Sequence, residues 1–311
     1  MLGIVLVNYK TEDKTIGYVQ QELSKIQCNY ILVIVNNSCT EESNMKLAEG
    51  CHAELVIDTD KVDSGTDIFI IGAGENLGYA KGNNLGAAFL RQHFNIDYYL
   101  FTNNDVRIVD GYVVEKMIEV AESRPSIGVI GPRVIGLDGK EQNPRQYITV
   151  WRRTIIPWLF LPILFPLIKR RFFRDVQKNA SEGEYYGVSG SFMLVRKEAF
   201  EMAGMFDPNT FLYAEELILS ERMLPLGFKT YFFPHVKVIH EHGQVTGRFL
   251  AVRDTLRMAF ESDMYYYRKY KKVGNMTIFF AKLSVSICLN VYLPIIKQIR
   301  RFLKCYKNSE V

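Results

Sequence analysis

The apolar residues of the first hundred positions form short runs, and each run ends in polar residues. Four runs rich in Val, Ile, Leu and aromatic residues predict buried strands, at 3–8, 30–35, 67–71 and 98–101. Segments 15–25 and 82–94 lie among these runs and predict helices. Strands that alternate with helices predict an α/β fold with a mostly parallel sheet, whose polar loops gather at one edge.

The segment 97–105, with the sequence DYYLFTNND, is the most informative of these runs. Its aromatic and aliphatic part predicts a buried parallel strand that ends in two amides and a carboxylate. Open α/β sheets bind ligands beyond the carboxyl ends of their strands, so Asp105 is a candidate ligand of a metal or a phosphate-bound cation. The alternative is that Asp105 only caps the helix expected near Asp110 or closes a turn.

A glycine- and asparagine-rich segment, 75–86, precedes this strand. Its glycines let the backbone approach a ligand closely, and its asparagine amides can both donate and accept hydrogen bonds. The spacing is neither that of a dinucleotide fingerprint nor that of a P-loop. The alternative is a loop whose glycines only ease the packing of the following helix.

The second half of the chain carries a further group of polar residues. Glu215 and Glu216 precede residues with helical spacing, which places them at a helix N-terminus, where the helix dipole favours negative charge without any catalytic role. Adjacent carboxylates on a helix point in different directions, so at most one would face a substrate. Segments 231–234 and 236–239 predict two strands, and His240 follows them.

The order of these motifs resembles that of the family 2 glycosyltransferases with a GT-A fold, and within them the rhamnosyltransferase-like branch of bacterial surface polysaccharide synthesis. The matching motifs run in the family's order from residue 1 to about 246: VNY at 7–9, VNNS at 35–38, NLGYAKGNN at 76–84, TNND at 102–105, 187–196, GMFD at 204–207, YAEE at 213–216, Pro234, and VIH at 238–240 with Gly243 and Thr246. The resemblance implies a GT-A, Rossmann-like mixed sheet that is mostly parallel and flanked by helices.

The resemblance also implies roles for individual residues. The donor-binding set would be Asn8, Tyr9 and Asn36 at the base and ribose, Asn76, Gly78, Lys81 and Asn84 at the diphosphate, and Asn103 and Asn104 beside the metal. Asp105, assisted by His240, would hold Mg²⁺ or Mn²⁺ against the diphosphate. Glu216 or Glu215 would deprotonate the acceptor hydroxyl in a direct, inverting displacement, and the motif register favours Glu216.

Three positions depart from the family pattern. Asn36 stands where the family usually has Asp, which weakens the assignment of a base contact. Asn103 begins the DXD-like motif, so Asp105 is its only acid. Glu216 replaces the usual Asp of the Glu-Asp pair, and its side chain reaches one methylene further.

Composition and charge bear on the cellular compartment in which the protein is expected to work. The net charge is +4, but ten Lys and Arg against one Glu from Met264 to the C-terminus give a local +9, so residues 1–263 carry −5. Five cysteines without a C-x-x-C pair indicate reduced thiols and argue against a disulfide framework or a zinc site. No signal-peptide pattern is expected at the N-terminus, because the apolar run at 2–7 is short and leads directly into polar residues.

Two segments are both apolar and basic. Residues 151–174 contain six basic residues, no acids and three central prolines, which disfavour a regular spanning helix. Residues 276–296 have about the length of a membrane span, but Lys282, Asn290 and Pro294 interrupt them. We expect amphipathic attachment to the cytoplasmic membrane face, with a transmembrane hairpin or ordinary packed helices as alternatives.

These expectations combine into one hypothesis. The predicted domains are a GT-A catalytic domain at 1–250, with an interfacial insertion at 151–175, and a basic helical extension at 251–311. The predicted activity is sugar transfer from a nucleotide-sugar donor, with UDP- and dTDP-sugars favoured, to a glycan or lipid-linked saccharide acceptor. We expect no nucleic-acid partner and allow for a homo-oligomer. The alternatives are a nucleotidyltransferase with a similar sheet and a catalytically weakened sugar-nucleotide-binding subunit.

Overall fold

The computed structural model describes residues 1–57, 62, 65–156, 175–241 and 252–292, together with 294, 295 and 298. The chain divides into two compact units. Unit 1 comprises residues 1–146 and 176–249, and unit 2 comprises residues 147–175 and 250–311. The proline-rich insertion and the C-terminal extension therefore belong to the same unit.

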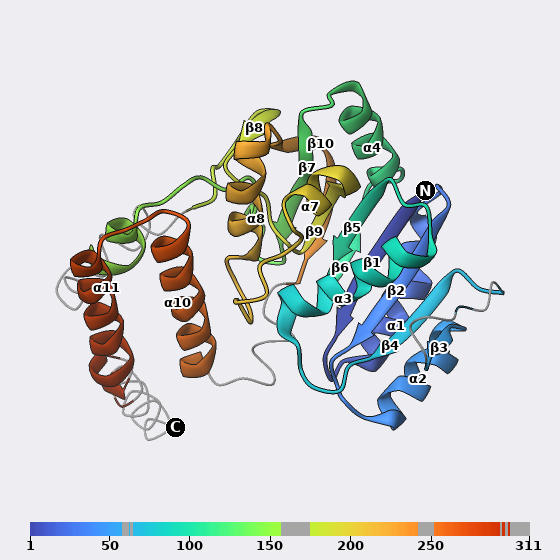
Figure 1. Cartoon of the computed structure of the whole chain (residues 1–311), viewed down its shortest axis with the longest axis horizontal. Coiled ribbons are helices and arrows are strands. Elements are labelled where there is room, and N and C mark those ends of the chain that lie inside the picture. Colours follow the sequence, from blue (N-terminus) through green and yellow to red (C-terminus); the bar gives the residue numbers. More distant parts are fainter. Residues whose placement is uncertain are drawn as a thin grey trace, which may run out of the picture. The chain divides into compact units, whose positions relative to one another are not determined.

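Unit 1 is built on a ten-stranded sheet (Figure 1). From edge to edge the strands are β3 (Glu54–Val56), β4 (Ile68–Gly72), β2 (Tyr30–Asn36), β1 (Leu2–Asn8), β5 (Tyr98–Thr102), β9 (Phe192–Arg196), β7 (Ile127–Gly136), β10 (Lys229–His240) and β6 (Val106–Ile108), and β8 (Gly183–Tyr185) pairs with β10. The strands from β3 to β5 are parallel, β9 is antiparallel to both its neighbours, and β7 and β10 are parallel. β6 and β8 run antiparallel to β10. The predicted mixed, mostly parallel α/β sheet is confirmed.

Helices cover both faces of this sheet. One face packs against α1 (Glu12–Gln21), α2 (Glu41–Cys51) and α4 (Val113–Ser123). The other face packs against α3 (Gly78–His93), α7 (Lys197–Met202) and α8 (Glu215–Met223). Short 3-10 turns, at Leu23–Lys25 and Leu224–Leu226, follow α1 and α8. Because both faces are covered, the central strands carry the nearly continuous apolar runs seen in the sequence.

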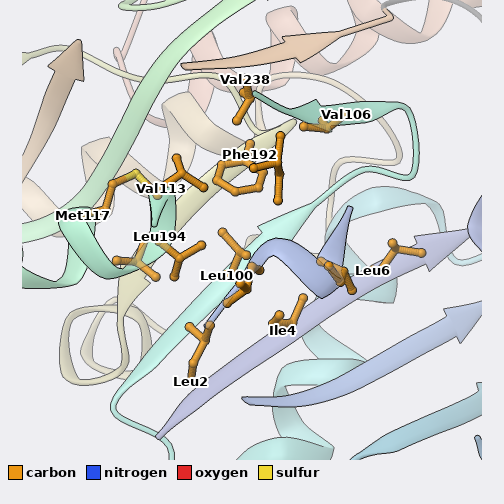
Figure 2. Packing of buried hydrophobic residues seen from close by; sticks show 14 of the residues in the cluster. Leu2, Ile4, Leu6, Leu100, Val106, Val113, Met117, Phe192, Leu194 and Val238 are labelled. Atoms are coloured by element: carbon orange, nitrogen blue, oxygen red, sulfur yellow. The ribbon is translucent and has the colours of Figure 1, made fainter. Parts of the chain in front are cut away.

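The core of unit 1 follows from the alternation of side chains along the strands. Leu2, Ile4 and Leu6 of β1 point to the face shown in Figure 2, where Leu100 of β5 and Met117 of α4 pack with them. Val5, between them in the sequence, belongs to the cluster on the opposite face. Full burial of each such side chain contributes about 1.5–3 kcal/mol, so both faces of the sheet contribute to its stability.

Two element boundaries differ from the predictions. α3 begins at Gly78, four residues earlier than expected, because the backbone N–H of Gly78 is capped by the Oδ1 of Asn76 at 3.1 Å. The two strands expected at 231–234 and 236–239 form one strand, β10, with a bulge. Its pairing with β7 shifts between Phe233 and Lys237, on either side of Pro234, which has no N–H to donate.

Unit 2 contains α10 (Val252–Lys269) and α11 (Asn275–Ile287), with π-helical turns at Trp151–Ile155 and Cys288–Tyr292. Arg153 ties the first turn to α10 through a 2.7 Å contact with Asp263. The segment Asn275–Tyr292 is long and apolar enough to cross a membrane by length and composition alone, and one third of it is buried. Residues 157–174, the centre of the predicted interfacial insertion, lie outside the described residues.

Candidate active site

The carboxyl ends of β1, β2 and β5 bring predicted polar residues to one edge of the sheet. Asn8 and Asn36 end β1 and β2 and are paired in register. β5 ends at Thr102, and residues 103–105 follow directly. This is the edge at which parallel sheets place their ligands. The sequence prediction of a shared edge therefore agrees with the observed topology.

Asp105 faces His240, the last residue of β10, because β10 pairs with β6 immediately after Asp105. Nε2 of His240 lies 3.2 Å from Oδ1 of Asp105, and both side chains are buried. The other ring nitrogen, Nδ1, lies 2.7 Å from Oε1 of Gln142. The ring of His240 therefore lies between Gln142 and Asp105, and the nitrogen that carries the proton determines to which of the two it donates.

The carboxyl of Asp105 is ionised at neutral pH. Burial by itself would raise its pKa, but the hydrogen bond and charge of His240 and the charge of Lys14 lower the pKa below its usual value. Oδ1 has no well-aligned hydrogen-bond partner among the described residues, although His240 is near. Oδ1 is therefore a buried carboxylate oxygen whose close neighbour among the described residues is the ring of His240.

The Asp105–His240 pair fits a divalent cation as a partial ligand set. Adjacent ligands of an octahedral ion, each about 2.0–2.1 Å from it, are roughly 3 Å apart, which matches the observed separation of 3.2 Å. Within the described part of the chain, no group of three or more His, Cys, Asp or Glu side chains could hold a metal. Any further ligands would therefore come from substrate phosphates and water.

The amides of Asn8 and Asn36 are engaged inside the protein. Nδ2 of Asn8 donates to Oδ1 of Asn36 at 2.8 Å, and Oδ1 of Asn8 accepts from Thr15 at 2.8 Å. Nδ2 of Asn36 donates to Ser43 at 2.8 Å and to Asn44 at 2.7 Å. Both asparagines are fully buried. In the structure they hold two strand ends together, and their contact with a base and ribose stays a prediction.

The three other predicted residues at these strand ends differ in their exposure. Asn104 is buried, and its Nδ2 donates to Thr11 and Thr15 at 2.8 Å each. Asn103 and Tyr9 are partly exposed at the same edge. Of the asparagine and tyrosine residues at these strand ends, Asn103 and Tyr9 are therefore the ones that a ligand could reach directly.

The start of α3 is the second part of the site. Gly78 has a φ of +70°, and a Cβ there would lie 2.2 Å from the carbonyl oxygen of Phe211. The N–H of Tyr79 donates to that same oxygen at 2.8 Å. Only glycine allows this approach, which joins the first turn of α3 to the segment before α8.

The remaining residues of the predicted diphosphate-binding set lie along α3. Asn76 caps the helix, and Lys81 is exposed in its first turn. Asn84 clamps the backbone of Phe206 with both amide atoms, at 2.8 and 3.0 Å. Lys81 is therefore accessible to an anion, whereas Asn84 has a structural contact with Phe206; their contact with a diphosphate stays a prediction.

Glu215 and Glu216 open α8, as predicted, and their environments differ. Oε1 of Glu216 lies 3.1 Å from Nη1 of Arg145, so its carboxylate is paired with a cation. Glu215 is buried, and its Oε1 has no hydrogen-bond partner among the described residues. Burial, followed by the charge of Glu216, raises the pKa of Glu215 to about 8. At neutral pH Glu215 therefore holds a proton, while the side chain of Glu216 is paired with Arg145.

One segment connects the two carboxylate regions. The backbones of Gly187 and Arg145 exchange hydrogen bonds of 2.8 and 3.3 Å. Four residues later, the carbonyl of Ser191 accepts from the N–H of Asn103 at 3.0 Å. The segment 187–191 is part of the predicted motif 187–196. It contacts Arg145, which pairs with Glu216, at one end, and the backbone of Asn103, two residues before Asp105, at the other.

Three charged or polar residues of the site lie outside the motifs found in the sequence. Glu12 accepts from Ser38 at 2.8 Å and Ser43 at 2.5 Å; burial alone would raise its pKa, but these hydrogen bonds lower it. Gln142 contacts His240, and Arg145 pairs with Glu216. No repeated spacing or composition marks them, since each acts through a partner far away in the sequence.

The mixed, mostly parallel sheet with helices on both faces is a GT-A-like fold, and Asp105 lies at the edge of the sheet where such folds place their ligands. A mannosyltransferase from Pyrobaculum calidifontis, solved in complex with GDP-Man and Mn²⁺, shares this fold with a TM-score of 0.56 and 10% identity, over 99% of this chain and 81% of that one. GalNAc-T7, solved with UDP, GalNAc and Mn²⁺, has a TM-score of 0.53 and 12% identity, over 96% and 57%.

Sequence comparison confirms the predicted resemblance at the level of distant homologues. The N-acetylglucosaminyl-diphospho-decaprenol L-rhamnosyltransferase of Mycobacterium tuberculosis is 26% identical over 58% of this chain and 61% of its own length. The low-salt glycan biosynthesis hexosyltransferase Agl10 of Haloferax volcanii is 25% identical over 70% and 59%. The dTDP-rhamnosyl transferase RfbF of Shigella flexneri is 22% identical over 92% and 82%.

The chain thus spans about three fifths of the length of the first two of these relatives. No family model matches the chain.

Proposed function

We propose that this protein is an inverting glycosyltransferase that moves a sugar from a nucleotide-diphosphate donor to a lipid-linked saccharide in surface polysaccharide synthesis. The observation that carries the proposal is the Asp105–His240 pair at the carboxyl edge of the sheet, in the same unit as the Glu215–Glu216 pair. The names of the relatives support sugar transfer, and one of them names a diphospho-decaprenol.

The donor side of the site is the strand edge together with the start of α3. The N-terminus of α3 favours negative charge, and Lys81 adds a cation in its first turn. Asp105 and His240 would hold Mg²⁺ or Mn²⁺, which when bound neutralises charge on the leaving nucleotide diphosphate. The protein itself contributes the carboxylate of Asp105, which its lowered pKa keeps ionised, and the imidazole of His240, which Gln142 orients.

The acceptor side is the start of α8. A base there removes the proton of the acceptor hydroxyl while the hydroxyl oxygen bonds to the anomeric carbon. The bond from that carbon to the phosphate oxygen breaks, its electron pair leaves with the nucleotide diphosphate, and the anomeric configuration inverts. Glu216 is better suited to this role than Glu215, because its carboxylate lies beside Arg145, whereas Glu215 retains a proton at neutral pH.

A second candidate function is a sugar-nucleotide-binding subunit with weakened catalysis. It is favoured by the single acid of the strand-end motif and by the internal bonding of Asn8, Asn36 and Asn104. Such a subunit would bind a donor but would not transfer its sugar.

A donor screen tests the proposal and separates it from this alternative. Thermal shifts are measured with UDP-, dTDP- and GDP-sugars, with and without Mn²⁺, and transfer is then assayed with the donor that binds. A donor at one hundred times its Kd stabilises the protein by about 2.7 kcal/mol, which raises Tm by several degrees. If no nucleotide sugar raises Tm at millimolar concentration, the glycosyltransferase proposal is wrong; binding without transfer supports the subunit.

We also propose that unit 2 attaches the protein to the cytoplasmic membrane face. Met276, Phe279 and Leu283 are exposed on α11, while Ile278 and Ala281 are buried, so this helix presents apolar side chains on an outer face as well as an inner one. Apolar surface of this kind, with neighbouring Lys and Arg, favours interfaces rich in anionic lipid. Flotation with phosphatidylglycerol vesicles, compared with neutral vesicles, is the test.

A further inference from the structure

Unit 2 contains a groove of about 750 Å³ between α10 and α11. Its lining residues recur with helical spacing on both helices, so each helix contributes one continuous face. On α10 these residues include Arg253, Arg257, Phe260, Met264 and Arg268, on α11 they include Ile278, Lys282 and Val285, and Leu289 follows in the π-helical turn after α11.

The floor of the groove is apolar. Phe260 and Met264 of α10, Ile278 of α11 and Leu289 of the turn after α11 are each less than a tenth exposed, and they line the groove from both sides. A floor of this composition favours a hydrocarbon chain over a polar ligand, since it offers few hydrogen-bonding groups to a solvated one.

The rim of the groove is cationic. Four cations, Arg253, Arg257, Arg268 and Lys282, face two acids, Asp254 and Glu261, which leaves a net charge of +2. Glu261 is engaged by Arg257 at 2.9 Å, and Arg253 donates to the amide oxygen of Asn290 at 2.7 Å.

Arg268 and Lys282 are the cations that the protein leaves available. Both are exposed, and neither has an ion-pair or hydrogen-bond partner among the described residues. They lie on opposite helices of the same groove, Arg268 near the C-terminal end of α10 and Lys282 in the middle of α11. Two unpaired cations above an apolar floor are complementary to an anionic amphiphile.

We propose that this groove binds the diphosphate and the first isoprene units of an isoprenoid-diphosphate lipid. A diphosphate diester carries a charge of −2, which balances the +2 of the groove, whereas the single phosphodiester of an ordinary phospholipid balances only half of it. The inference rests on the proposed function only in identifying this lipid as the carrier of the saccharide acceptor. The binding site itself is a property of α10 and α11.

Farnesyl diphosphate is the probe, and titration calorimetry on the full-length protein in EDTA is the measurement, because EDTA suppresses metal-dependent binding of diphosphate at Asp105. Inorganic pyrophosphate and farnesol represent the two halves of the probe. We expect farnesyl diphosphate to bind at least tenfold more tightly than either half, because it uses the rim and the floor together.

The variant pair R268Q/K282Q removes two rim charges from exposed positions and should weaken binding of the probe at least tenfold. The matched control, K116Q/K178Q, removes two exposed cations of unit 1, both outside the groove, and should bind as the wild type does. Circular dichroism and Tm are measured for both, and an unchanged Tm shows that the loss is not one of folding.

Equal binding by R268Q/K282Q and wild type would overturn the proposal, as would pyrophosphate binding as tightly as the probe. Phosphatidylglycerol vesicles that displace the probe at equal lipid phosphate would assign the groove to an ordinary phospholipid, which also overturns it. The donor thermal shift is recorded on the same variants. If no donor binds while the probe still requires Arg268 and Lys282, the proposed enzymatic function fails and the lipid site stands.

Discussion

The buried carboxyl of Glu215 gives a stability prediction that needs no substrate. Glu215→Gln keeps the size and the hydrogen-bonding shape of the protonated side chain but cannot ionise. The pKa of Glu215 is raised from 4.5 to about 8 in the folded protein, first by burial and then by the charge of Glu216. The unfolded chain therefore loses this proton at a lower pH than the folded one.

The sign of the effect follows from proton linkage. Between pH 4.5 and about 8 the folded protein binds one proton more than the unfolded chain at this position, so wild-type stability falls as pH rises, by 1.36 kcal/mol per pH unit at most. Across the whole interval this amounts to about 5 kcal/mol, a large part of the 5–15 kcal/mol typical of a domain. Glu215→Gln does not lose stability in this way. The difference in unfolding free energy between the variant and wild type should therefore grow in favour of the variant as pH rises, and level off above pH 8.

Urea unfolding at pH 5.5, 7.0 and 8.5 measures this difference. Far-UV circular dichroism is the suitable probe, because the two tryptophans of the chain, Trp151 and Trp158, belong to unit 2 and would not report on the sheet of unit 1. Glu198→Gln is the matched control, since Glu198 is an exposed glutamate in the first turn of α7. Its stability should follow the wild-type pH dependence.

Parallel pH curves for wild type and Glu215→Gln would refute the reasoning, because they would mean that Glu215 ionises at its ordinary pKa in the folded state. A variant that is less stable than wild type at every pH would also contradict it. That result would show that the ionised carboxylate is stabilised by contacts rather than disfavoured by burial.

Three further changes have defined outcomes. Gly78→Ala should cost roughly 2–5 kcal/mol of unfolding free energy, because the new Cβ combines a positive φ with a clash against the carbonyl of Phe211. The control is Gly17→Ala, in open space on α1, which should leave stability unchanged or raise it. Equal changes in unfolding free energy for the two variants would contradict the contact at Gly78. Asp105→Asn should abolish the Mn²⁺-dependent part of a donor thermal shift, and an unchanged dependence on Mn²⁺ would remove Asp105 from the metal site. Glu216→Gln should lower the rate of transfer at least about a hundredfold without changing the donor thermal shift; retained transfer would assign the base elsewhere.

The sequence predicted the architecture well because the fold depends on local patterns. Apolar runs ending in Asn or Asp marked β1, β2 and β5, and their parallel pairing placed Asn8, Asn36 and Asp105 at one edge. The strands β3, β6, β7 and β8 were not predicted. β3, β6 and β8 have three residues each, too few to form an apolar run, and β7 contains glycines and a proline, which are unfavourable inside strands. Pro234 suggested a break between two strands, but β7 pairs with β10 on both sides of the bulge and keeps it continuous.

The chemistry of individual side chains was less predictable because it depends on partners distant in the sequence. The sequence could place Glu215 and Glu216 at a helix start, but only the folded chain brings Arg145 to one of them and buries the other. The residue type of Asn84 indicated a contact with a ligand, whereas in the structure its amide is hydrogen-bonded to the backbone of Phe206, more than a hundred residues away. Hydrogen-bonding capacity can be read from a residue type, whereas its use depends on tertiary contacts.

We infer from the strand edge that one acid can serve there where the family pattern has two. If the edge binds a nucleotide diphosphate, as proposed, a second carboxylate at position 103 would add a negative charge beside the phosphates, and two unit charges about 5 Å apart repel by roughly 3 kcal/mol at an effective dielectric constant of 20. Asn103 avoids that repulsion, so the donor would depend less on a cation to offset the protein's own charge. The lowered pKa of Asp105 keeps its carboxylate ionised, and His240 would supply a second ligand atom without adding negative charge. An edge with one acid would therefore bind the cation less tightly, and the nucleotide diphosphate more tightly, than an edge with two.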